Sequence, residues 1–524
     1  MGMLAEAFVP LQALTGSAPA QGAGTEAGSL RPDRAAASAA PRTRGPRVAL
    51  VPLGCAKNLV DSEIMLGLLD QAGFRVTGDP GRADVVVVNT CAFIDEAKQE
   101  SIDAILSVAD GRPVIVAGCL AQRYPDQLLA EMPEISAVVG TGDFSEIVDV
   151  ARRVLAGERV CAVGHQAARY ERVFPRRRIE TGPSAYVKIA EGCDHDCRFC
   201  AIPSFRGRFR SRPAAVVLEE CAGLAAQGAR ELILVSQDTT FWGRDLPAAE
   251  GGARLHLGHL LRAVGTAAAP HGPAWVRCLY LYPYLLDDRI LDAWAGSPGA
   301  LPYFDMPLQH GSDEILAAMA RPDRRQSIVR LCGRIRRRLP GAVLRTSFIV
   351  GYPGETEAHF RELLDLLAEV EFDHAGFFVY SNEDGTPAAD MPDQVPEELR
   401  HERYQRAMEA QGEIAARRNA GRVGRTLATL IERPLPGSPG YFEGRWWGQA
   451  PDVDGACVVA GAGLRAGDLV QVRIEGCDGF DLFGRVDVPA ADGDGGAPSG
   501  AADALSPEMV RAAREGRRAR VNSG

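Results

Sequence analysis

The sequence lacks three features that would assign the protein to a particular class. No stretch of its 524 residues approaches the ~20 apolar residues of a membrane-spanning helix, so we expect no membrane segment. The amino terminus has no basic start, and Glu6 interrupts "MLAEAFVPLQAL", so it does not resemble a secretory signal. A basic excess is also missing, because the net charge is −10. Proteins that bind a polyanion are usually basic, so direct binding of nucleic acid is disfavoured.

The two ends of the chain lack the composition of a folded domain. Residues 1–45 are rich in Ala, Gly, Ser and Pro, and residues 489–524 are similar and end in "REGRRARVNSG". Such segments bury too little apolar surface to offset the entropy lost on ordering, so we expect both to be disordered. Between them, changes of texture predict three domains, over residues 46–160, 179–410 and 411–488.

Cysteine is plentiful, with twelve residues in a chain that carries no secretory signal. This usage indicates a reducing, cytoplasmic location and metal or cluster chemistry rather than disulfide bonds. Half of the cysteines stand in no special pattern, and we expect them to be buried apolar side chains. They are Cys161, Cys221, Cys278, Cys332, Cys457 and Cys477.

In the first predicted domain, cysteines follow three apolar runs. "VALVPLGC", "ADVVVVNTC" and "RPVIVAGC" end at Cys55, Cys91 and Cys119, and helical segments separate them. Such runs are typical of parallel strands that are buried on both faces. The carboxyl ends of parallel strands meet at one edge of the sheet, where ligands bind. We therefore predict an open parallel α/β sheet with three thiols converging on a metal site; coincidence is the competing interpretation.

The second predicted domain alternates six strand-like and helical segments, which predicts a partial (β/α)6 barrel. The stretch "EGCDHDCRFC" places Cys193, Cys197 and Cys200 in the loop after its first strand, where such barrels carry their chemistry. In the third domain, short apolar runs broken by Gly, Pro and Asp predict a small antiparallel β-barrel. The fold class is therefore α/β.

Each group has three cysteines, whereas a cubic [4Fe–4S] cluster takes four ligands. Three protein ligands leave one iron open to bind another molecule. Structural zinc is the alternative, and His195 could supply its fourth ligand. No second cysteine pair follows at zinc-finger spacing, so a cluster is favoured over zinc.

The Cys-x3-Cys-x2-Cys loop, with Phe199 before its last cysteine, resembles the radical S-adenosylmethionine (SAM) superfamily. With the three-cysteine sheet and the small carboxyl-terminal barrel, a TRAM domain, the chain resembles the methylthiotransferases. Stretches such as "LVSQDTT", "YLYPY" and "MPLQHG" resemble the branch that modifies protein twelve of the small ribosomal subunit. The resemblance runs from about residue 48 to the end of the small barrel and leaves out only the two tails.

The resemblance implies two [4Fe–4S] clusters and SAM. Cys193, Cys197 and Cys200 would be the catalytic ligands of the radical cluster, and the amino-terminal trio would hold an auxiliary cluster. A radical derived from SAM would remove hydrogen from the β-carbon of an aspartate, and a second SAM would supply the methyl group. The implied partners are the ribosomal protein, free or in the ribosome, and a low-potential electron donor.

Further cofactor contacts are expected near the ends of the barrel strands. Gln237 and Asp238 could meet the cofactor's amino group, although a capped turn explains them as well. Gly351 and Glu355 could contact the cofactor or could form only a tight turn. Arg345 interrupts a strand, where a charge needs a partner such as the cofactor carboxylate. Phe199 completes this set, whereas His310 is expected to be structural and the "RRR" at 176–178 to be solvated.

Two other functions compete with this one: a tRNA adenosine methylthiotransferase and a non-catalytic iron–sulfur or zinc protein. Residues 418–487 hold eight basic and nine acidic side chains, whereas a barrel that binds RNA should be basic. This balance favours a basic ribosomal protein as the partner. We expect Asp478 and Asp481 to be among the groups that attract it.

Overall fold

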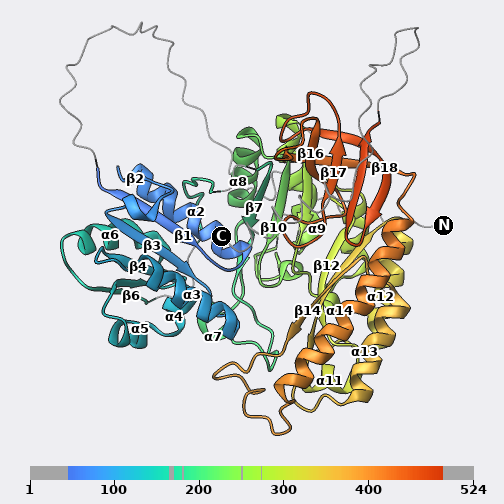
Figure 1. Ribbon diagram of the computed structural model, residues 1–524, viewed down its shortest axis with the longest axis horizontal. Coiled ribbons are helices and arrows are strands. Elements are labelled where there is room, and N and C mark those ends of the chain that lie inside the picture. Colours follow the sequence, from blue (N-terminus) through green and yellow to red (C-terminus); the bar gives the residue numbers. More distant parts are fainter. Residues whose placement is uncertain (1–44, 165–169, 180–181, 249–251, 273, 488–524) are drawn as a thin grey trace, which may run out of the picture.

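The computed structural model describes residues 45–487, except 165–169, 180–181, 249–251 and 273. Figure 1 shows a parallel sheet (blue), a central barrel (green to yellow) and a small β-barrel (orange to red). The disorder predicted for both tails lies outside the described residues. Within the described part of the chain, no helix is long and apolar enough to cross a membrane.

The amino-terminal domain is a six-stranded sheet in which every pair of neighbours is parallel, as predicted. Its strands, in spatial order, are β2 (Arg75–Val76), β1 (Arg47–Pro52), β3 (Val85–Thr90), β4 (Val114–Gly118), β5 (Ile135–Val139) and β6 (Val160–Ala162). Apolar helices cover both faces, which is why β3 and β4 are wholly buried. One face carries α2 (Ala56–Gln71) and α6 (Ile147–Leu155), and the other carries α3 (Asp95–Val108), α4 (Cys119–Arg123) and α5 (Pro125–Glu131).

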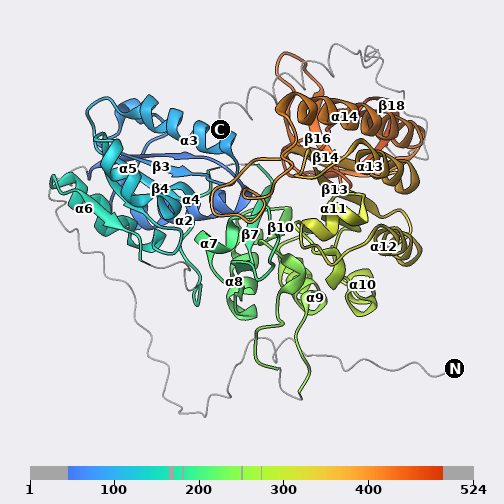
Figure 2. The same ribbon diagram turned by 90° about the horizontal axis from the view of Figure 1, so that it is seen from below.

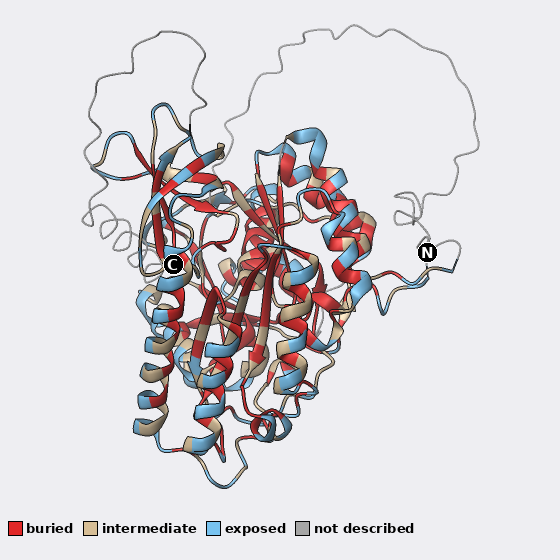
Figure 3. Cartoon of the chain, turned by 90° about the vertical axis from the view of Figure 1, so that its right-hand side faces the viewer, coloured by how far each residue is buried: buried red, intermediate tan, exposed pale blue. Residues whose placement is uncertain are grey.

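The central domain contains six parallel strands in two groups of three. The first group is β7 (Ser184–Lys188), β10 (Glu231–Val235) and β11 (Trp275–Cys278), and the second is β12 (Tyr303–Gln309), β13 (Val343–Val350) and β14 (His374–Val379). The groups adjoin where the Leu281 N–H donates to the Asp305 carbonyl at 2.8 Å. The predicted partial barrel is confirmed: its strands are buried in the centre and its helices turn their exposed faces outward (Figure 3).

The barrel helices follow the strands in the order of the sequence. They are α8 (Ala214–Ala226), α9 (Leu257–Ala268), α10 (Asp288–Ala295), α11 (Asp313–Ala318), α12 (Arg325–Arg338), α13 (Glu357–Val370) and α14 (Glu397–Ala420). After β7, the short strands β8 (Ala190–Glu191) and β9 (Arg210–Ser211) pair with each other and enclose a loop and helix α7 (Ile202–Arg206). Figure 2 shows α7 between the parallel sheet and the barrel.

The carboxyl-terminal domain is a closed five-stranded barrel. Its strands are β15 (Thr426–Pro434), β16 (Tyr441–Trp446), β17 (Cys457–Ala460), β19 (Asp481–Val486) and β18 (Leu469–Asp478), in spatial order. The prediction of a small barrel is confirmed, but not all of its pairs are antiparallel. Because β18 closes the barrel on β15, β19 lies between β18 and β17 and pairs in parallel with β17.

Helix α14 does not fit the predicted boundary between residues 410 and 411. It continues to Ala420, and its Ala407 and Ile414 are buried in the core of the central barrel. We therefore propose that the central domain extends through α14 and that the small barrel begins in the turn after Ala420.

Buried ion pairs fasten the small barrel to the central one. The Glu231 carboxylate of β10 pairs with Arg277 at 2.7 Å and with Arg445, from β16, at 2.6 Å. All three side chains are almost fully buried. Burial alone would raise the pKa of Glu231, but Arg445 and Arg277 lower it to about 2. These ion pairs join the two barrels, because separating the barrels would leave buried charges unpaired, at a cost in free energy.

Removing Arg445 should therefore destabilise the protein. We expect Arg445→Met to lower the free energy of unfolding by about 3 kcal/mol, because it breaks the buried pair between the barrels and leaves Glu231 with Arg277 as its one remaining cation. The exposed Arg465 gives a matched control, and Arg465→Ala should change stability by about 0.5 kcal/mol or less. Urea denaturation followed by circular dichroism measures both, and equal effects would contradict this account of the interface.

Candidate functional site

The amino-terminal cysteines follow adjacent strands at one edge of the sheet. Cys55 caps α2 after β1, Cys91 follows β3, and Cys119 begins α4 after β4. The strand order places the reversal of connectivity between β1 and β3, where open parallel sheets bind ligands. The loops touch: a β-carbon added to Gly54 would lie 3.2 Å from the Cys91 Sγ. The structure thus brings the three thiols together, as the spacing predicts.

Two polar side chains complete the surroundings of these cysteines. Asn58 Nδ2 donates to the carbonyls of Leu53 and Thr90, at 3.2 and 2.9 Å, and so ties two of the cysteine loops together. Arg206, from α7 of the central domain, donates to the Cys119 Sγ at 3.1 Å. The amino-terminal cysteine group is therefore closed by a residue of the neighbouring domain.

The three amino-terminal thiols differ in acidity. Burial alone would raise the pKa of Cys55, but Lys57 and Arg206 lower it below the ordinary value. Burial, followed by the neighbouring Cys119 and Cys55, raises the pKa of Cys91 to about 12. Burial also raises the pKa of Cys119, against the effect of Arg206. A bound cation would have to stabilise the thiolates of Cys91 and Cys119.

The second group lies in the loop between β8 and α7. The Cys193 N–H donates to the Gly207 carbonyl at 3.1 Å, and the Cys200 N–H donates to the Cys197 carbonyl at 3.0 Å. Burial is the first cause that raises the pKa values of Cys193 and Cys200 to about 12. Arg321 points its guanidinium at the Cys197 Sγ, 3.9 Å away.

An aromatic column stands beside this loop. The His195 ring stacks on Tyr282 with 3.7 Å between centroids and 9° between planes, and Arg321 lies 4.0 Å from the Tyr282 centroid. His195 Nε2 is 2.7 Å from the Asp238 Oδ2. The zinc alternative needs His195 as a fourth ligand, but here its Nε2 is engaged by Asp238.

Gln237 offers an acceptor to a ligand. Its Nε2 donates to Glu191 at 2.9 Å, whereas its Oε1 is buried and has no hydrogen-bond partner among the residues that the structure describes. A buried acceptor without a partner is costly, and an amino group such as that of SAM would satisfy it. Asp238 also caps the turn that follows, because its Oδ1 accepts from the Phe241 N–H at 3.2 Å.

Phe199, Gly351 and Glu355 have partners within the protein. Phe199 packs in an apolar cluster that includes Tyr352. The Glu355 carboxylate is buried and accepts from the Gly351 N–H at 2.8 Å, while Arg403 pairs with it at 2.9 Å. These contacts describe a tight turn, which was the alternative explanation; the predicted cofactor contacts stay predictions.

Arg345 has partners within the protein. It pairs with Asp305 at 2.6 Å and with Asp454 of the small barrel at 3.4 Å. The predicted cofactor contact was based on the need of a charge within a strand for a partner. Asp305 and Asp454 supply such partners within the protein. His310 is fully buried and accepts from the Ser312 N–H at 2.9 Å, which fits its expected structural role.

A buried ionic network, which we call the seam network, joins the two domains beside the cysteines. It consists of Asp61, Lys188, Glu191 and Arg206. The Lys188 Nζ lies 2.5 Å from Asp61 and 2.8 Å from Glu191, and Arg206 lies 3.1 Å from Glu191. Sequence reasoning missed it, although Lys188 interrupts the apolar run "YVKIA" just as Arg345 interrupts its own strand.

Two expectations about other residues need correction. Cys221, Cys278, Cys332 and Cys457 are buried as predicted, but Cys161 is exposed on the short edge strand β6 and Cys477 is only partly buried. Arg176 is not solvated: its side chain is 7% exposed and pairs with Glu63 and with Glu220. Arg176 thus adds a second buried contact between the domains.

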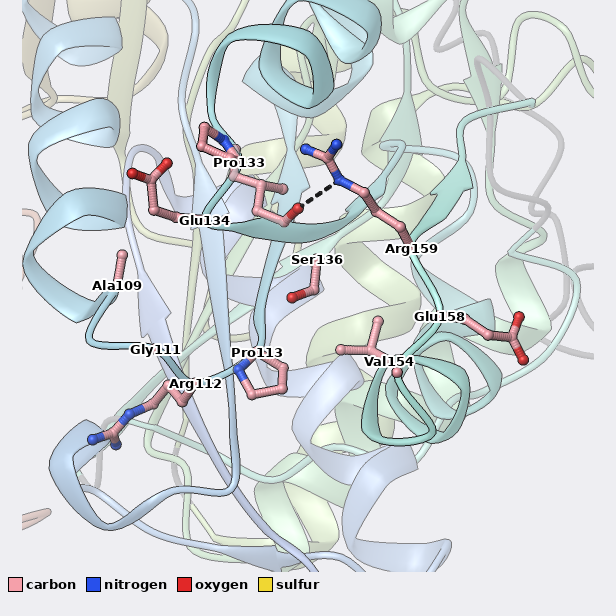
Figure 4. A pocket seen from close by; sticks show the side chains of 12 residues that line it. Ala109, Gly111, Arg112, Pro113, Pro133, Glu134, Ser136, Val154, Glu158 and Arg159 are labelled. Atoms are coloured by element: carbon pink, nitrogen blue, oxygen red, sulfur yellow. Dashed lines mark hydrogen bonds between the residues drawn. The ribbon is translucent and has the colours of Figure 1, made fainter.

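A hollow in the sheet domain lies away from the cysteines. Its volume is about 400 Å³, and residues that precede β4, β5 and β6 line it, with Arg159 Nε donating to the Ile135 carbonyl at 3.1 Å (Figure 4). These are the amino ends of the strands, opposite the cysteine edge. Among the described residues, no three His, Cys, Asp or Glu side chains stand close enough to hold a single metal ion.

Comparisons with known proteins agree with this arrangement. Three family models match: "Uncharacterized protein family UPF0004" over residues 47–140, the "Radical SAM superfamily" over 187–367 and the "TRAM domain" over 423–486. Ribosomal protein uS12 methylthiotransferase RimO of Symbiobacterium thermophilum is 46% identical over 468 residues, which cover 88% of this chain and 95% of that one. The RimO of Synechococcus sp. (strain RCC307) is 48% identical over 460 residues, covering 87% and 92%.

The chain belongs to the RimO family. It is accordingly a radical SAM methylthiotransferase, and the family implies [4Fe–4S] clusters and SAM as its cofactors. Among solved structures, the radical SAM methyltransferase TsrM from Kitasatospora setae shares 18% identity and a TM-score of 0.49, covering 66% of this chain and 74% of that one. That likeness is too distant to support an inference about the RimO-family chain.

Arg206 contacts the thiol of Cys119, so replacing it should weaken cluster binding by the amino-terminal cysteines. We expect Arg206→Met to lower the iron bound after anaerobic reconstitution from about eight atoms towards about four, because it removes the guanidinium that contacts Cys119. Iron and sulfide analysis with the visible absorption spectrum measures this loss. Arg208→Ala removes a neighbouring but exposed arginine and should keep the full complement; loss of iron in both variants would contradict a specific role.

Proposed function

We propose that the protein methylthiolates the β-carbon of an aspartate in ribosomal protein uS12. In this proposal Cys193, Cys197 and Cys200 hold the radical cluster, and Cys55, Cys91 and Cys119 hold the auxiliary one. The observation that carries the proposal is the contact of Arg206 with Cys119, because Arg206 ends helix α7, which directly follows the loop of the radical cysteines. It makes the two cysteine groups neighbours, as transfer between two clusters requires.

The reaction replaces a C–H bond beside a carboxylate by a carbon–sulfur bond, which acid–base catalysis alone cannot do. When bound, the reduced radical cluster and SAM supply the radical that removes hydrogen, and the auxiliary cluster supplies sulfur. The residues of the chain hold and orient these groups. Gln237 offers its buried Oε1 as a hydrogen-bond acceptor. The stacked rings of His195 and Tyr282 lie beside the radical loop. The seam network holds the two cysteine groups in a fixed relative position.

One feature of the small barrel favours a protein substrate, but one expectation about its acidic residues is wrong. It has no basic excess, which argues against the tRNA alternative. The expectation that Asp481 attracts the ribosomal protein is wrong, because Asp481 is 2% exposed and accepts from the Ala456 N–H at 2.8 Å. Asp478 is exposed and stays a candidate for that role. The non-catalytic alternative does not explain two neighbouring three-cysteine groups at the carboxyl ends of a sheet and a barrel.

The remaining partners belong to the proposal as well. We place the reaction in the cytoplasm, on uS12 either free or in the ribosome, with a low-potential electron donor. A reduced cluster must pass an electron to a sulfonium, which requires such a donor.

Mass spectrometry of uS12 tests the function directly. Reconstituted protein, dithionite and SAM should convert the aspartate of unmodified uS12 to its methylthio derivative. Cys193→Ala and Cys91→Ala should each reduce the yield by at least about a hundredfold, since each removes a proposed cluster ligand. Cys161→Ser changes an exposed cysteine far from both groups and should keep the wild-type yield. Methylthiolated tRNA together with unmodified uS12 would overturn the proposal and promote the tRNA alternative.

A further inference from the structure

Lys57 occupies the seam between the parallel sheet and the central barrel. It lies in the first turn of α2, two residues after Cys55, at the carboxyl end of β1. Its Nζ is 3.5 Å from the ring centroid of Tyr280, which follows β11 at the carboxyl end of the barrel strands. The ammonium therefore lies between the carboxyl ends of the sheet strands and the carboxyl ends of the barrel strands.

Several other cations near the two cysteine groups pair with carboxylates. Lys188 and Arg206 pair with Asp61 and Glu191 in the seam network, and Arg321 pairs with Asp323 at 3.4 Å. Among the described residues, no carboxylate forms an ion pair with Lys57; its ammonium lies over the Tyr280 ring and acts on the thiol of Cys55. A partly buried ammonium in this setting retains the capacity to bind an anion.

The ring that supports Lys57 is held in an uncommon backbone conformation. Tyr280 has φ of 61°, a value that residues other than glycine rarely adopt. Its N–H donates to the Asp305 Oδ2 at 2.9 Å, and its carbonyl accepts from the Thr239 N–H at 3.0 Å. These bonds fix the backbone that carries the ring over Lys57. Such fixed, strained positions cluster at binding sites.

We propose that Lys57 binds the side-chain carboxylate of the target aspartate and so holds its β-carbon between the two cysteine groups. The inference rests on the proposed function, since it takes its ligand from the proposed substrate. SAM also carries a carboxylate, but Lys57 is adjacent in sequence to the sheet cysteine Cys55, not to the radical loop. An ammonium that has no carboxylate partner would select an anionic side chain over a neutral one such as asparagine.

Binding of the unmodified target protein tests this role. The probes are uS12 with its aspartate and uS12 in which that aspartate is replaced by asparagine, titrated into anaerobically reconstituted enzyme by fluorescence anisotropy. Wild-type enzyme should bind the aspartate form about tenfold more tightly, the size of one charge-assisted hydrogen bond. Lys57→Met should bind both forms alike, and Lys57→Arg, which keeps the charge, should restore most of the preference.

Two controls separate this role from a structural one. Arg75→Met removes an exposed charge on the far edge strand β2 and should leave the preference unchanged. The affinity for SAM should match the wild type in Lys57→Met, and binding is compared at equal iron content because Lys57 also lowers the pKa of Cys55. An undiminished preference in Lys57→Met, or a loss of SAM affinity in its place, would overturn the inference. If wild-type enzyme failed to bind or modify uS12 at all, the proposed function itself would be refuted. That result differs from the two outcomes for Lys57→Met, which concern only the role of Lys57.

Discussion

The pairing of buried charges across the seam between sheet and barrel is the constraint on which the site depends. Asp61 comes from the sheet domain, whereas Lys188, Glu191 and Arg206 come from the first unit of the barrel. Such a network adds little net stability compared with apolar packing, but it penalises any docking that leaves a charge unpaired. The relative position of the two cysteine groups is therefore set by electrostatics as well as by shape.

The sequence predicts the elements of the fold well because their signals are local. Apolar runs that end in cysteine identify β1, β3 and β4 and the edge where their ligands meet, and the alternation of strands and helices identifies the barrel. The boundary that we propose after Ala420 differs from the one predicted at residue 411, because Ile414 of α14 is buried in the core of the central barrel and helical periodicity does not tell which domain a helix packs on.

The partners of charged side chains were predicted less well, because they depend on contacts between residues far apart in the sequence. Arg345 needed a carboxylate, as expected, but it found Asp305 and Asp454 within the protein. Arg176 seemed a surface charge in a run of three arginines, yet Glu63 and Glu220 enclose it. Exposure of Asp481 was likewise misjudged, because a strand's first residue can turn its side chain inward to bond a neighbouring loop. None of these pairings leaves a local signature.

The order of the chain gives the seam network a consequence for synthesis. Lys188 follows its partner Asp61 by 127 residues, and Arg176 follows Glu63 by 113. While the ribosome makes the chain, the completed sheet domain thus carries two carboxylates destined for burial whose cations have not yet been made. Until the first barrel unit emerges, these carboxylates remain hydrated and keep one side of α2 open to water. The amino-terminal domain therefore reaches its final form only as the barrel folds against it, so the two must mature as a pair.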